Sequence, residues 1–192
     1  EILSSEAIYY QNRLYRHYAF GSFRELFLKI CVDNAMLVYL DGYTNRKNSP
    51  NENFAREMFE LYSIGKGPQI AEGDYTNYTE EDIKAATRVL TGWEFDDTFT
   101  HPDPETGLPA GKLRSHTAGD PATEVATEHD PGSKIFTSKF GGRTLEPAEF
   151  AGGFPTVAAA EGELRAMIEM IFEQPETRSE ERRVGKECIV KC

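Results

Sequence analysis

The residues best suited to do chemistry form one short polar run in the first third of the chain. The run contains five such side chains: Asn51, Glu52, Asn53, Arg56 and Glu57. Residues four apart lie on the same face of a helix, so Arg56 can reach Glu52 on one side and Glu60 on the other. Three interpretations stay open: an exposed ladder of ion pairs, a buried polar network between helices, or the lining of a binding or catalytic cleft.

A second candidate group consists of His129, Asp130 and Lys134, which surround a Pro-Gly dipeptide. The alternative to a functional role is a turn, in which the Asp130 side chain holds the backbone ahead of the proline and glycine. Metal sites need ligands clustered at fixed spacings, and the chain has no HxH, HExxH or CxxC pattern. The sequence therefore predicts no metal site.

Trp93 is the one aromatic residue that suggests a ligand contact. It follows Ile83, Ala86 and Leu90 at roughly helical spacing, which predicts that it continues an apolar stripe into the core. The alternative is a platform on which a sugar stacks. The spacing favours the core.

Helical periodicity supplies the elements that must position these residues. Two capping signals mark helix starts, one at Ser22 with Glu25 and one at Thr79 with Asp82. Asp33 can cap a shorter helix that follows it. The expected helices span residues 5–18, 23–31, 34–40, 51–65, 79–93 and 163–172.

Residues 94–162 differ in composition and are expected to be irregular. Seven of the ten prolines lie there, which favours loops, and a single strand is expected at about Lys134–Phe140. The predicted fold class is mainly α: a multi-helix domain fragment with a loop-rich segment and at most one small β-hairpin. Residues 1–177 would form a single partial domain, helical over 5–93, irregular over 94–162 and ending in a helix over 163–173.

Four stretches in this order carry a resemblance to a known family. The two most specific are NENFAREMFELYSIGKG at Asn51–Gly67 and YTEEDIKAATRVLTGW at Tyr78–Trp93; residues 17–40 and 129–142 supply the others. Together they resemble the uncharacterised bacterial family called domain of unknown function 1800, over about residues 11–177. The resemblance implies a longer, commonly exported protein, of which this chain is an internal fragment. It implies no activity and no cofactor.

Residues 178–192 are expected to be artefactual, because they resemble translated sequencing-adapter DNA and have no apolar periodicity. The whole chain has a net charge of −11 and no basic stripe, which argues against nucleic acid as a partner. No run approaches the roughly 18 apolar residues of a membrane span. The sequence predicts no membrane span in this fragment.

Two function hypotheses follow. The first is an exported helical scaffold or binding protein whose partner, a protein or a polymer, is unknown. The second is a hydrolase acting on a carbohydrate or other envelope polymer, with Glu52, Arg56, Glu57 and His129 in a polar cleft. The second requires residues 51–57 and 129–134 to converge on one concave site. The sequence identifies no cofactor for either.

Overall fold

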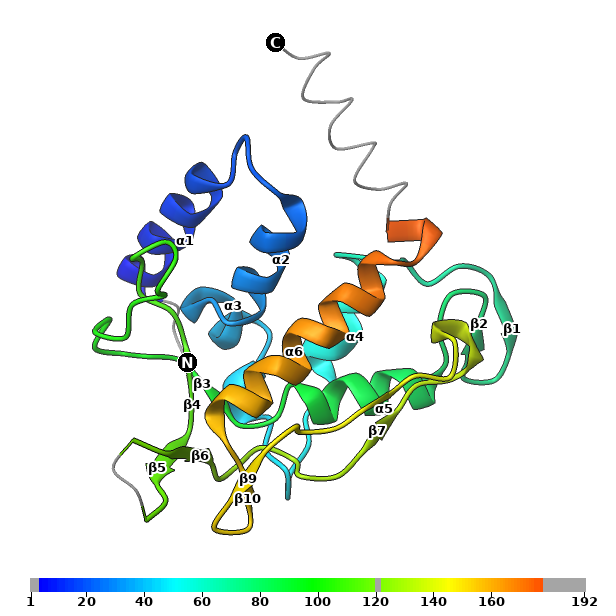
Figure 1. Cartoon of the computed structure of the whole chain (residues 1–192). Helices are drawn as coiled ribbons and strands as arrows, with labels where there is room; N and C mark the ends of the chain where they lie inside the picture. The colour runs from blue at the N-terminus through cyan, green and yellow to red at the C-terminus, as the bar shows by residue number, and fades with distance from the viewer. Residues whose placement is uncertain (1–3, 120–121, 178–192) are drawn as a thin grey trace.

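The computed structural model describes residues 4–119 and 122–177. The α-helices in this part of the chain are α1 (Ser5–His17), α2 (Phe23–Cys31), α3 (Asn34–Tyr39), α4 (Asn53–Glu60), α5 (Glu80–Val89) and α6 (Val157–Phe172). Two short 3-10 helices are η1 (Gly42–Thr44) and η2 (Ser138–Phe140). Helix α6 crosses the centre of the molecule and packs against α2 and α5, while α3 contacts both α1 and α2 (Figure 1).

Side-chain caps fix where several of these helices begin, as the sequence predicted for three of them. Ser22 accepts a hydrogen bond from a backbone N–H in the first turn of α2, and Asp33 does the same for α3. Thr79 and Asp82 form a full capping box at the start of α5. Caps of this kind contribute about 1 kcal/mol each.

The predicted fold class, mainly α with at most one hairpin, is wrong: the fold is mixed α/β. Helices account for 41% and strands for 17% of the described residues. The strands pair in five separate antiparallel hairpins. They are β1 (Gln69–Ala71) with β2 (Asp74–Tyr75), β3 (Trp93–Glu94) with β4 (Lys112–Leu113), β5 (Ser115–Thr117) with β6 (Glu124–Ala126), β7 (Lys134–Ile135) with β8 (Thr144–Leu145), and β9 (Phe150–Ala151) with β10 (Phe154–Pro155).

The error has a physical cause in the length of the strands. Each has only two or three residues, too few for an alternating pattern to appear in the sequence. The strand expected at Lys134–Phe140 is limited to β7, and η2 follows it.

Helix α6 begins at Val157 rather than at 163, because Thr156 caps it by accepting a hydrogen bond from the N–H of Ala159. Helix α4, by contrast, is shorter than the predicted 51–65.

The main core lies between the helices and the inner sides of the hairpins. Met167 and Ile171 of α6 and Ile83 of α5 are fully buried there, and so is Phe136, which directly follows β7. Fully burying an apolar side chain of this size stabilises a fold by about 1.5–3 kcal/mol. The hairpin region therefore packs against the helical core. Polar side chains that become buried at this contact need hydrogen-bond or ion-pair partners there.

Over the described residues, no helix combines the length and the apolar character needed to cross a membrane. The expected artefactual tail, residues 178–192, lies outside the described residues.

Candidate functional site

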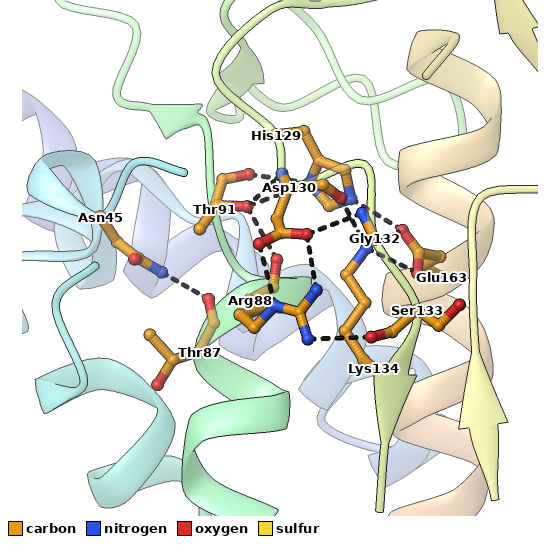
Figure 2. A network of polar contacts seen from close by, with 10 residues as sticks. All are labelled: Asn45, Thr87, Arg88, Thr91, His129, Asp130, Gly132, Ser133, Lys134 and Glu163. Atoms are coloured by element: carbon orange, nitrogen blue, oxygen red, sulfur yellow. Dashed lines mark hydrogen bonds and ion pairs between the residues drawn. The ribbon is translucent and has the colours of Figure 1, made fainter. Parts of the chain in front are cut away.

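Three ionisable side chains form a buried cluster where the loop before β7 meets α6. His129 and Lys134 are 0% exposed and Glu163 is 3% exposed. Lys134 Nζ lies 2.8 Å from both carboxylate oxygens of Glu163, and His129 Nε2 lies 2.7 Å from Oε2 (Figure 2). We call these three residues the buried triad.

The remaining polar atoms of the buried triad are satisfied by backbone carbonyls. His129 Nδ1 lies 2.9 Å from the carbonyl oxygen of Thr91, which can only accept, so Nδ1 carries a proton. Lys134 Nζ also donates to the carbonyl of Asp130 at 2.7 Å. Burial lowers the pKa of Lys134 below its usual value, and Glu163 opposes this by stabilising the charged amine. The arrangement is that of a satisfied network in the protein interior.

A close backbone approach brings His129 to this position. Gly92 has a φ of 86°, and a Cβ there would lie 2.8 Å from the backbone nitrogen of His129. Only glycine combines this conformation with this approach at no steric cost. The Gly92 amide also donates to the carbonyl of Asn45 at 2.8 Å, which ties the end of α5 to the loop after η1.

Next to the triad, Asp130 forms a bidentate ion pair with Arg88 at the end of α5. Arg88 Nε and Nη2 each lie 2.9 Å from one carboxylate oxygen, and Nη1 donates to the carbonyl of Ser133 (Figure 2). The Asp130 carboxylate also accepts from the amide of Gly132 at 2.8 Å. The guanidinium and this amide lower the pKa of Asp130 despite its partial burial. Asp130 thus holds the turn, which the sequence analysis gave as the alternative to a functional role.

The Arg56 cluster lies at the other end of α5. Arg56 binds both oxygens of Glu80, at 2.9 and 2.6 Å, and reaches Glu52 at 3.2 Å and Glu60 at 3.7 Å. The side chains of Arg56, Glu80 and Glu52 are 31%, 33% and 41% exposed. The cluster is therefore half-buried and joins α4 to α5, which fits neither a fully buried network nor a simple surface ladder.

Replacing Arg56 with Ala is expected to lower the free energy of unfolding by about 1–2 kcal/mol. This lies between the value for an exposed pair and the larger value for a buried one, because water reaches part of the cluster. Urea denaturation of the variant beside the parent measures it. Lys84→Ala, which removes an exposed ion pair with Glu81, is the control and should change stability by less than about 0.5 kcal/mol. A loss of 4 kcal/mol or more, on the order of a buried pair, would contradict this.

The other residues of the predicted run make local hydrogen bonds or have no partner among the described residues. The Asn51 side chain donates to Thr44 Oγ1 at 2.8 Å and accepts from the amide of Asn53 at 3.0 Å. Asn53 donates to the carbonyl of Leu40 at 3.1 Å. The side chain of Glu57 makes no hydrogen bond or ion pair with another described residue.

The two predicted groups do not converge on one concave site. Glu80, the partner of Arg56, begins α5 and Arg88 lies near its end, about 12 Å further along the helix axis at 1.5 Å per residue. The buried triad is closed off from solvent. The hydrolase hypothesis, which required a shared cleft, has no support.

Three residues that matter here were not singled out from the sequence: Glu163, Arg88 and Glu80. Glu163 had a usable signal, because it falls on the apolar side of α6 with Leu164, Met167 and Met170. An acidic residue inside an apolar stripe needs a buried partner. Within residues 4–119 and 122–177, no three His, Cys, Asp or Glu side chains gather closely enough to hold a metal ion.

Trp93 lies in β3, so its predicted place on a helix is wrong, but it is 5% exposed and belongs to the main core. Its indole Nε1 is buried and has no hydrogen-bond partner among the described residues. Such an atom is rare in a folded protein, where most buried donors are paired.

Comparison with known proteins gives one match. A family model described as "Protein of unknown function (DUF1800)" matches residues 3–180, which is most of the chain. No curated protein and no solved structure matches. The matched span contains all four of the stretches on which the sequence resemblance rests.

Proposed function

The chain belongs to the DUF1800 family of proteins of unknown function, and we propose that its described part is a scaffold for binding rather than a catalyst. One observation carries the proposal: the buried triad, a histidine, a lysine and a glutamate that could take part in acid–base chemistry, is 0–3% exposed. Side chains this buried cannot touch a polymer substrate. Their hydrogen bonds instead join the turn at Asp130, strand β7 and helix α6.

The other polar contacts support the same role. The Arg88–Asp130 pair fastens the turn before β7 to α5, and the Arg56–Glu80 pair fastens α4 to α5. Two-stranded hairpins are marginally stable alone, so they need such attachments to hold a fixed surface. As part of the same proposal we place the protein outside the bacterial cytoplasm, on the family resemblance alone; fractionation of cells producing the full-length protein tests this.

The test of the scaffold role is the substitution Glu163→Gln, which is expected to lower the free energy of unfolding by about 2–3 kcal/mol. Glutamine keeps the size and some hydrogen bonds but removes the negative charge between Lys134 and His129. Chemical denaturation measures the change. The matched control is Glu169→Gln on the exposed side of the same helix, expected to stay within about 0.5 kcal/mol of the parent.

The direction in which Glu163→Gln changes the free energy of unfolding distinguishes a scaffold role from a catalytic role. Groups retained for catalysis are commonly held at a cost in stability, so neutralising them tends to stabilise the fold. A Glu163→Gln variant that is as stable as the parent, or more stable, would therefore count against the scaffold role.

A further inference from the structure

A cleft with a volume of about 320 Å³ lies between α2, α6 and the segment 101–111. Apolar side chains that are mostly buried and polar side chains that are exposed line it together. The apolar side chains include Leu28, Val32 and Leu164, and the polar ones include His101, Glu161 and Arg165. The volume is at the small end of the range for ligand pockets, about 300–1,000 Å³, and suits a molecule of roughly one sugar ring.

The wall formed by segment 101–111 is fixed before any ligand arrives. Lys29 of α2 lies 2.6 Å from Asp103 and 3.2 Å from Glu105, so its charge already has partners. The amide of Gly111 donates to the carbonyl of Val32 at 2.7 Å. A Cβ at Gly111 would lie 2.3 Å from Leu37 Cδ1, so this close approach depends on glycine. A preformed cleft reduces the entropy that binding must overcome.

Other polar groups of the cleft lack strong partners. Glu161 is exposed and makes no hydrogen bond or ion pair with another described residue. Among the described residues, Arg165 forms one ion pair, with Glu25 at 3.9 Å, and it also interacts electrostatically with Glu161. Trp93 also lines the cleft, and its indole N–H is buried without a partner in the described part of the chain. The cleft thus offers a free acceptor in Glu161 and a weakly engaged donor in Arg165.

We infer that this cleft binds a small, neutral, polyhydroxylated ligand about the size of one sugar ring, an inference that rests on the binding role proposed above. Hydroxyl groups both donate and accept, so one can donate to Glu161 while another accepts from Arg165. The C–H groups of the ring match the apolar side chains. Lys29 and Arg165 balance Asp103 and Glu161 in charge, which favours a neutral ligand over an ion.

The chain contains a single tryptophan, so its indole N–H resonance reports on the cleft without ambiguity. The ¹⁵N-labelled chain would be titrated with glucose, galactose and N-acetylglucosamine and followed by NMR. At least one sugar is expected to shift the Trp93 indole peak in a saturable way, with a Kd of about 1 mM. Glu161→Ala should weaken that binding about tenfold or more, through loss of a charge-assisted hydrogen bond. Glu169→Ala, exposed on the same helix, should leave the Kd unchanged.

Each outcome of the NMR titration supports or overturns a specific part of the inference. An indole peak that no sugar moves overturns the inference. If glycine, a small zwitterion, moves the peak and the sugars do not, the ligand class is wrong. Equal sugar affinity in the parent and in Glu161→Ala overturns the assigned contact; the remaining backbone peaks show whether the variant is folded. None of these results alters the stability measurement on Glu163→Gln, so failure of this inference is distinct from failure of the scaffold proposal.

Discussion

Replacing Lys134 with Met is expected to lower the free energy of unfolding by about 3–5 kcal/mol. Lys134 is 0% exposed, and its amine donates to both oxygens of Glu163 and to the carbonyl of Asp130. Methionine fills similar space but has no donor. The Glu163 carboxylate would stay buried with His129 as its partner, and the carbonyl would lose its bond. Chemical denaturation with a fitted m-value measures the loss.

A double variant shows whether the effect comes from the stranded charge. Lys134→Met combined with Glu163→Leu removes both charges, and pairs replaced by apolar residues are often near neutral in stability. We expect the double variant to be more stable than Lys134→Met alone. Lys84→Met, which removes an exposed amine, is the control for the loss of a lysine as such. A double variant whose loss equals the sum of the single losses would show that the two groups are not coupled.

The helices and their starts were predictable because their signals are local. Ser22, Asp33 and Thr79 each bond to a backbone N–H within the first turn of their helix, so the sequence alone contains both partners. The start of α6 was missed although Thr156 caps it in the same way. Residues 157–160, Val-Ala-Ala-Ala, follow that cap and show no polar face from which a helical period could be read.

The hairpins were not predictable for the opposite reason. A two-residue strand has no periodicity, and its pairing depends on the turn and on what it packs against. Lys134 shows this, because it is the first residue of β7 and also the fully buried amine of the triad. Two of its three hydrogen bonds go to Glu163 on α6, a partner that lies 29 residues away in the sequence.

The candidate site was half predictable, and the same distinction between local and distant partners explains which half. His129, Asp130 and Lys134 were recognised as a group because they are adjacent in sequence. Their partners were not: Glu163 lies 29 residues from Lys134, and Arg88 lies 42 residues from Asp130. For Arg56 the local rule found Glu52 and Glu60 but missed Glu80, which forms the shorter and bidentate pair.

Trp93→Ala is expected to lower the free energy of unfolding by about 3–5 kcal/mol, because it leaves a cavity in the main core. Trp93 is 5% exposed and lies where β3 meets the helices. The indole N–H has no partner among the described residues, so it contributes no hydrogen bond to be lost.

Trp93→Phe therefore distinguishes the contribution of the apolar ring from that of the indole N–H. Phenylalanine retains most of the apolar ring and removes the unpaired N–H, so its cost should stay under about 1.5 kcal/mol. Denaturation of both variants, followed by circular dichroism because the tryptophan itself is absent, gives the comparison. If Phe were as damaging as Ala, the N–H would have a partner that stabilises the fold. If Ala were nearly neutral, Trp93 would not fill the core at all. The expected order, with Ala far less stable than Phe, would show that Trp93 stabilises the fold through its apolar ring and not through its N–H.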